Sequence, residues 1–247
     1  MRLAVALLLM LLSGAAAARP VRPLFEPTDL EMEQPGVLDV DLQIGVVRGA
    51  DTGPYRVVTP DFELDVGILS WLELDIDGTY AVDEDAHAVP DNLWVSAKIV
   101  AAGARSPVTG RAFGLGLQIG PKLPVAPGSS GVGVEGLALI GGLLGRTQAV
   151  LNFGGFIDPD PDGTGRDEGI EAGLDLEIHL SGPWSLLGEL SGISFVSHDP
   201  DQLISTAGIK WSPRESFDLS LVALWGYLDG SDRWGLLLGV SPKFRLL

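Results

Sequence analysis

The feature that most constrains this chain is a regular alternation of acidic and apolar residues over strand-length segments. Residues 167–182 read DEGIEAGLDLEIHLSG, and shorter stretches at 62–66 and 72–77 repeat the pattern. Successive side chains of a β-strand point to opposite faces, so each segment presents one apolar face and one ionisable face. Soluble β-sandwiches can share this pattern. It is also typical of membrane barrels, whose strands turn apolar residues to lipid and polar residues inward.

The N-terminus has the composition of an export signal. Arg2 precedes an apolar run from Ala4 to Leu12, and small residues follow from Ala15 to Ala18. This order of charged, apolar and small-residue regions is typical of a cleavable signal peptide. The alternative is an uncleaved membrane anchor, which is disfavoured because the apolar run is short for a spanning helix.

We expect the chain to divide into three parts. Residues 1–18 would be the signal peptide, residues 19–35 a periplasmic N-terminal extension, and residues 36–247 the barrel. The extension contains four prolines and shows no clear strand or helix period. An extended lead-in and a disordered tail are therefore both open interpretations of it.

Composition narrows the possible functions. The sequence has no Cys, which excludes disulfides, thiolate sites and lipid attachment to a cysteine. Its net charge of −17 argues against nucleic acid as a partner. Mean hydropathy is +0.28 although 20% of the residues are charged. A barrel resolves this conflict, because it exposes apolar residues to lipid and keeps charges inside and in loops.

Twelve segments carry strand patterns, and the connections between them alternate in length. Short turns are expected near 69–70, 145, 182–183 and 212–214, and most other connections are longer and rich in Asp, Gly and Pro. The pattern predicts an all-β fold: a transmembrane, antiparallel, up-and-down β-barrel of about 12 strands in the bacterial outer membrane, with both termini in the periplasm. The expected strands are 36–48, 60–69, 71–82, 92–103, 111–120, 131–144, 146–157, 169–181, 184–195, 203–212, 216–228 and 234–246.

Aromatic residues gather near the predicted strand ends. Two girdles at the membrane interfaces would explain this, because such rings have an apolar body and often a polar tip. The aromatic core of a β-sandwich would lie mid-strand, where only Phe153 and arguably Trp225 fall. The periplasmic girdle would hold Trp71, Phe113, Trp184, Trp211, Phe217 and Phe244, and the outer girdle Phe62, Tyr80, Trp94, Phe156, Phe195, Tyr227 and Trp234.

The inward-facing side chains of the predicted barrel are mostly acidic. One interpretation is a polar, cation-favouring passage, and the alternative is a lumen closed by carboxylates, water and lysines. Asp39, Asp41, Asp218 and Lys122 also have inward parity. The residues that we expect to line the pore are Glu63, Asp65, Glu73, Asp75, Asp77, Lys98, Glu171, Asp175, Glu177, Glu189 and Lys210.

One loop begins like a calcium site. Asp158, Asp160 and Asp162 have the spacing of the first ligands of a calcium loop. The bidentate glutamate expected at the twelfth position is replaced by Gly169. We interpret 158–168 as an acidic surface loop and leave calcium binding open.

A second motif pairs a possible base with a possible nucleophile. His179 and Ser181 share a strand face, and outer-membrane phospholipases resemble this chain in carrying a His-x-Ser on a barrel strand. The same face carries Asp175 and Glu177, so we expect the pair to point into the lumen and not toward lipid. The sequence therefore predicts no enzyme and no cofactor and, apart from the calcium question left open at 158–168, no metal site.

Several stretches carry a family resemblance: PDFELDVGILSWLELDIDGTY, GLGLQIGPKLPV, LNFGGF and QLISTAGIKWSPRESFDLSLVALWGYL. From about residue 60 to Leu247 the chain resembles the outer-membrane transporter-like β-barrels associated with the meta-pathway of phenol degradation. The resemblance implies an outer-membrane barrel that passes hydrophobic or aromatic compounds. The chain ends FRLL from Phe244, whereas such barrels usually end in an aromatic residue that the assembly machinery reads.

Three functions follow as hypotheses. The first is a passive outer-membrane channel for small solutes, including hydrophobic or aromatic compounds. The second is a structural or adhesive outer-membrane barrel with a closed lumen, and the third is a soluble periplasmic barrel that binds an apolar ligand. The partners expected for the first are outer-membrane lipids, small solutes and the barrel assembly machinery, without nucleic acid.

Overall fold

A computed structural model describes most of the region expected to form the barrel. The expected signal peptide and most of the expected extension lie outside the described residues. Within them, no helix is long and apolar enough to cross a membrane. The described residues are 30, 32–49, 55–82, 88–102, 113–159, 167–196 and 199–246.

Thirteen strands make up the described fold. Twelve are long, with 10 to 15 residues each, and β4 has three. The strands are β1 (Val37–Arg48), β2 (Tyr55–Leu69), β3 (Leu72–Val82), β4 (Ala88–Pro90), β5 (Leu93–Ala102), β6 (Gly114–Leu123), β7 (Gly133–Leu144), β8 (Thr147–Ile157), β9 (Glu168–Ser181), β10 (Trp184–Phe195), β11 (Gln202–Arg214), β12 (Phe217–Gly226) and β13 (Trp234–Arg245).

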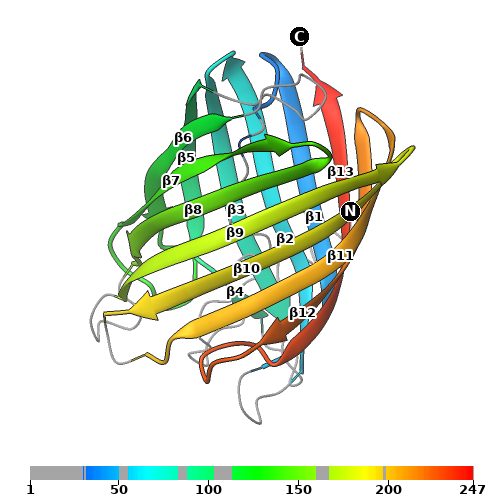
Figure 1. The fold of residues 1–247 in the computed structure, drawn as a ribbon. Helices are drawn as coiled ribbons and strands as arrows, with labels where there is room; N and C mark the ends of the chain where they lie inside the picture. Colours follow the sequence, from blue (N-terminus) through cyan, green and yellow to red (C-terminus); the bar gives the residue numbers. More distant parts are fainter. Residues whose placement is uncertain are drawn as a thin grey trace, which may run out of the picture.

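The sheet closes on itself because β1 pairs with both the next strand and the last one. All pairs are antiparallel: Leu38 on β1 lies opposite Val66 on β2 and Phe244 on β13. Twelve strands thus form an up-and-down barrel, with β4 added beside β3 (Figure 1). Each of the twelve long strands described pairs with a neighbour on both sides, which is what an apolar surrounding demands of a sheet.

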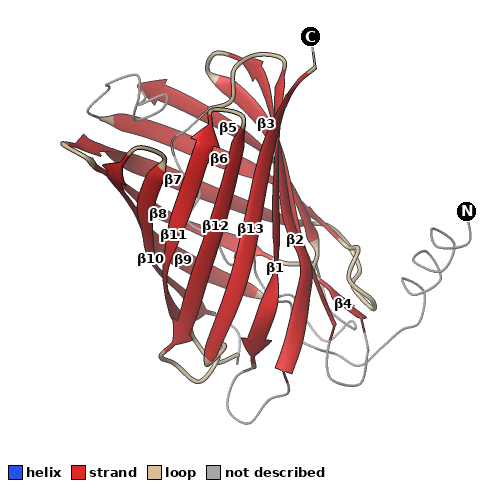
Figure 2. Ribbon diagram, turned by 90° about the vertical axis from the view of Figure 1, so that its right-hand side faces the viewer, coloured by secondary structure: helices blue, strands red, loops and turns tan. Residues whose placement is uncertain are grey.

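The two ends of the barrel differ in their connections. The start of β1 and the end of β13 meet at one end, which we call the terminal end. Tight turns make four of the five connections at this end, and two of them place Gly145 and Gly182 at positive φ. The fifth, from Ala102 to Gly114 between β5 and β6, is long and falls mostly outside the described residues. The other longer connections lie at the opposite end, the far end. A quarter turn of the view shows the tilted strands running between the two ends (Figure 2).

The predicted barrel of about 12 strands is confirmed, with three local differences. β2 begins at Tyr55 and not at residue 60, because a register shift between Val58 and Asp61 interrupts its alternation. β11 continues through Pro213, beyond another register shift, so the turn falls at 215–216. β4 was missed because three residues are too few to show a period.

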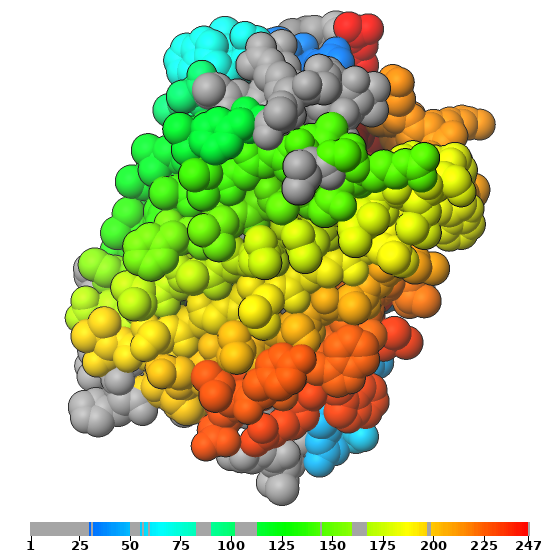
Figure 3. Space-filling view, viewed as in Figure 1, coloured from blue at the N-terminus to red at the C-terminus, as the bar shows by residue number. Residues whose placement is uncertain are grey.

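The outer face of the wall is apolar. Every long strand turns aliphatic side chains outward, such as Leu151 on β8 and Leu238 on β13, which are 49% and 47% exposed. Figure 3 shows side chains packed closely over one side of this wall. Soluble monomers rarely expose contiguous apolar patches above a few hundred Å², so this face suits an apolar surrounding.

Several aromatic residues lie where the predicted girdles place them. At the terminal end, Trp71 and Trp184 are exposed outward, and at the far end Trp234 packs edge-on against Tyr55 with ring centroids 5.7 Å apart. Trp94 and Phe156 were wrongly assigned to the outer girdle. Both lie at the far end but face the interior, where they are 4% and 3% exposed.

The described part of the expected extension folds into the barrel. Leu30 and Met32 pack in an interior apolar cluster with Trp94, Val100, Leu137, Leu139 and Val150. Leu30 is 1% exposed. Leu30 and Met32 thus lie against an apolar patch of the inner wall, whereas Gln34 and Pro35 are exposed. The periplasmic placement of the extension stays a prediction.

Candidate functional site

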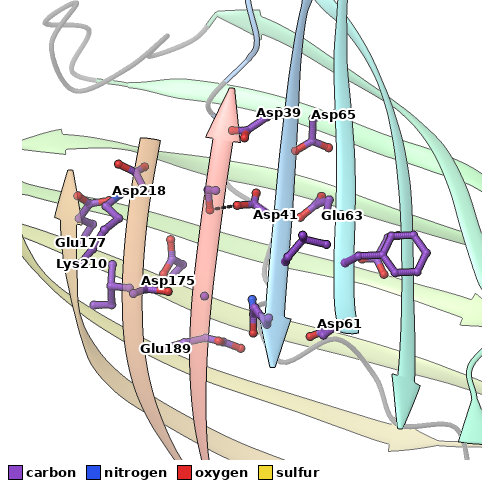
Figure 4. Close-up of a pocket in the computed structure, with 18 of the residues that line it drawn as sticks. Asp39, Asp41, Asp61, Glu63, Asp65, Asp175, Glu177, Glu189, Lys210 and Asp218 are labelled. Atoms are coloured by element: carbon purple, nitrogen blue, oxygen red, sulfur yellow. Dashed lines mark hydrogen bonds and ion pairs between the residues drawn. The ribbon is translucent and has the colours of Figure 1, made fainter. Parts of the chain in front are cut away.

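An interior cavity of about 220 Å³ is the candidate site. Twelve carboxylate side chains and three lysines line it, so its lining is strongly acidic. Figure 4 shows carboxylates from β1, β2, β9, β10 and β12 projecting into this space. The acidic residues are Glu33, Asp39, Asp41, Asp61, Glu63, Asp65, Glu73, Asp77, Asp175, Glu177, Glu189 and Asp218, and the lysines are Lys98, Lys210 and Lys243.

The structure brings nine of the eleven expected pore-lining residues to this cavity. They are Glu63, Asp65, Glu73, Asp77, Lys98, Asp175, Glu177, Glu189 and Lys210. Asp75 and Glu171 are buried but are not part of the cavity lining. Asp75 instead accepts hydrogen bonds from Ser96 (3.1 Å) and Gln118 (3.0 Å).

Three charged residues of the cavity were not predicted from the sequence. Lys243 has the same parity on β13 as Ser241 and Gly239, so extending the alternation to the end of that strand would have found it. Asp61 has the same parity as Glu63 and Asp65 on β2, so the alternation would have placed it inward as well. Glu33 precedes the first strand, and no periodic signal places it inside the barrel.

Each cavity lysine contacts a carboxylate. Lys98 on β5 lies 2.8 Å from Glu73 on β3, and Lys210 on β11 pairs with Glu177 on β9. Lys243 contacts both Glu33, at 2.5 Å, and Asp39, at 2.9 Å. With twelve acids against three lysines, these contacts leave the lining with a negative excess.

Carboxylates also gather at two overlapping points near the cavity. Oxygen atoms of Asp41, Glu63 and Asp65 lie within 4.8 Å of one another, and so do those of Asp65, Glu73 and Asp75. Carboxylate oxygens are the ligands that calcium and similar hard cations take. These groups mark where carboxylate oxygens lie close together inside the barrel. The sequence expectation of no resident metal stays a prediction.

A second ionic cluster lies outside the cavity lining, at the far end of the inner wall. Lys122 on β6 lies 2.9 Å from Glu135 on β7 and 2.8 Å from Asp158. The Lys122 ammonium also sits 5.6 Å from the ring centroid of Phe156. The Asp158 carboxylate thus forms an ion pair with Lys122. Residues 160–166 of the loop considered for calcium lie outside the described residues.

Solved structures share this fold. An outer membrane channel from Pseudomonas putida F1 matches with a TM-score of 0.64 and 13% identity over 89% of this chain and 100% of that chain. The NanC porin matches with a TM-score of 0.58 and 10% identity over 83% and 100%. The β domain of the Bordetella autotransporter BrkA matches with a TM-score of 0.50 and 14% identity, over 86% of this chain and 100% of that chain.

The fold is that of outer-membrane channels and porins. No protein-family model matches the chain, and no curated protein matches its sequence. The resemblance to the phenol meta-pathway barrels therefore stays a prediction. At these identities the similarity establishes the fold, and the solute has to be argued from the interior.

His179 and Ser181 are both exposed at the terminal end of β9. His179 lies opposite Ser185, whose side chain is buried, so its parity stays inward, whereas a register shift separates Ser181 from that alternation. The expected lumenal placement of the pair therefore stays a prediction. The interior chemistry of this barrel is thus that of carboxylates and lysines, which can attract, orient and repel ions.

Proposed function

We propose that this protein is a passive outer-membrane channel for small polar solutes, with a preference for cations. The observation that carries the proposal is an acidic cavity inside a closed barrel whose outer face is apolar. A lining of fixed negative charge raises the local concentration of cations and excludes anions. No cofactor and no bond chemistry are needed, because the protein would select solutes only by how favourably they enter the cavity.

The interior favours polar solutes over the aromatic compounds that the family resemblance implies. A hydrophobic solute in the cavity would displace water from charged side chains, and burying unsatisfied charge is costly. The apolar interior clusters do not change this, because their side chains pack against one another. Val47, Val58, Leu224 and Leu237 form one of them, on the β1, β2, β12 and β13 side.

Cation selectivity gives the direct test. Under a salt gradient across a planar bilayer, the wild-type reversal potential should have the sign of cation flow. The triple variant Asp41→Asn, Glu63→Gln, Asp175→Asn should move it toward zero, because it removes three carboxylates from the cavity. The effect should shrink in high salt, since the screening length falls from about 10 Å at 0.1 M to about 3 Å at 1 M.

Asp229→Asn is the matched control for charge removal. Its side chain is 86% exposed between β12 and β13 and is screened by solvent. We expect it to shift the reversal potential much less than the triple variant does. An anion-selective wild type would refute the proposed preference.

Orientation in the membrane can be tested in cells because the native chain has no Cys. We propose that the terminal end faces the periplasm. A thiol at Asp229→Cys, on the far end, should then react with an impermeant maleimide on intact cells. A thiol at Glu215→Cys, in the turn between β11 and β12, should react only after the outer membrane is permeabilised. The reverse pattern would overturn the orientation.

A closed structural barrel is the second candidate. The observation that favours it is the N-terminal segment inside the wall, where Leu30 is fully buried and Glu33 lines the cavity. If that segment never leaves, the bilayer stays silent and the carboxylates serve only to pack the interior.

A further inference from the structure

We infer that residues 30 and 32–36, which we call the strap, form a latched constriction of the channel, with Glu33 as its selectivity-determining side chain. The inference rests on the proposed channel function. It concerns a segment that belongs to no strand and yet lies among the inward-facing side chains. Three sets of contacts hold the strap, and each comes from a different part of the wall.

The first contact is an apolar anchor. Leu30 and Met32 are 1% and 8% exposed and pack against the inner faces of β5, β7 and β8. Leu30 also reaches Gly116 on β6, where a Cβ would lie 3.1 Å from its Cδ2 atom. The strap therefore extends to the wall opposite the one where β1 begins.

The second contact is an ionic latch at Glu33. Its carboxylate accepts from Lys243 on β13 at 2.5 Å, and its backbone N–H donates to the Glu73 carboxylate on β3. Burial raises the pKa of the Glu33 carboxyl above its ordinary value, while the Lys243 ammonium opposes that rise. Charge-assisted hydrogen bonds of this kind are the strong ones. Glu33 thus ties β13 and β3 together across the cavity that it lines.

The third contact is a backbone fit at Gly67 on β2. A Cβ placed there would lie 2.3 Å from the carbonyl oxygen of Gln34 and 2.4 Å from that of Glu33. The Gly36 N–H also donates to the Gly67 carbonyl at 2.8 Å. The wall can accept the strap at this point only because the residue is glycine, so even one methyl group would press the strap away.

The strap can leave without breaking the barrel. None of the strand pairs described includes residues 30 or 32–36, and the β1 ladder begins after them at Val37. Its contacts are side-chain packing, the latch and a few backbone hydrogen bonds. Local openings of this kind lie at the low end of the stability range within one protein. The strap in place would narrow the passage, and its release would widen it.

Two independent variants should open the channel. Gly67→Ala pushes the strap backbone, and Glu33→Gln removes the charge of the latch while keeping its shape. Single-channel recordings in planar bilayers should show each variant raising the ratio of open to closed time about tenfold or more, as expected for losing one hydrogen bond to a charged group. Glu33→Gln should also lower cation selectivity, whereas Gly67→Ala should leave the charge of the lining unchanged.

Each variant has a matched control. Gly136→Ala adds a methyl group on β7 where the nearest atom, Ile119 Cγ1, is 3.4 Å away, an ordinary contact. Asp229→Asn removes a carboxylate outside the cavity, at an exposed position of the far end where its partner is Arg233. The controls should gate like the wild type. Equal gating in the controls and in both strap variants would overturn the constriction.

A chemical readout locates the strap whether or not the barrel conducts. In the Cys-free chain, Met32→Cys places one thiol in the buried anchor. In the refolded barrel it should react with a water-soluble maleimide about tenfold faster or more when Gly67→Ala or Glu33→Gln is added. Equally fast labelling in every background would overturn the strap. Slow labelling together with bilayers silent for all variants would instead overturn the channel, and the constriction with it.

Discussion

Replacing Leu151 by Arg should lower the free energy of unfolding from a lipid bilayer by about 2–4 kcal/mol. Leu151 lies near the middle of β8, is 49% exposed on the outer face, and is paired with Leu174 of β9. If this face contacted water, exchanging an exposed leucine for arginine would change stability by only about 0.5 kcal/mol or less. Urea titration of the barrel in lipid vesicles measures the difference.

Leu246→Arg is the control with the same chemical change. Leu246 is 53% exposed and follows the last strand at the terminal end. Its backbone N–H donates to the Gly36 carbonyl, a hydrogen bond that does not involve the side chain. The cost of an arginine falls to about 0–1 kcal/mol near the interface. Equal and small costs at both positions would refute the membrane barrel and favour the soluble alternative.

The barrel was predictable because one physical rule repeats in every strand. Lipid outside and polar groups inside force a period of two, and that period is visible in segments such as β9 even without any relative. The same rule placed most cavity residues correctly. Asp65, Asp175 and Glu189 come from three strands, and parity alone brought them to one space.

Prediction failed where another signal was given more weight than the alternation, and where the alternation is broken or absent. Trp94 has the same parity on β5 as the inward Lys98, so the alternation predicted its interior position. It was assigned to the outer girdle instead because it lies at a strand end. Register shifts hid the start of β2 and the end of β11. The strap has no period at all, and its place depends on distant groups such as Gly67 and Lys243 that only folding brings together.

The interior charge pairs lead to a second large effect, at Lys98. Its ammonium lies 2.8 Å from the Glu73 carboxylate, and the two side chains are only 5% and 1% exposed. Lys98→Met keeps most of the side-chain volume but leaves Glu73 buried without this cation, close to Asp65 and Asp75. Breaking one partner of a buried ion pair costs about 3–5 kcal/mol, and we expect a loss of that size in lipid vesicles.

The double variant Lys98→Met, Glu73→Gln separates the charge from the packing. Removing both charges should recover much of the stability that the single variant loses, because no uncompensated carboxylate then remains at position 73. Lys210→Met is the comparison, since Lys210 and Glu177 are 24% and 21% exposed and solvent already screens their attraction. Its expected cost is about 1 kcal/mol or less. If Lys98→Met were as mild as Lys210→Met, water would reach Glu73 freely, and the passage would extend past the cavity wall at β3.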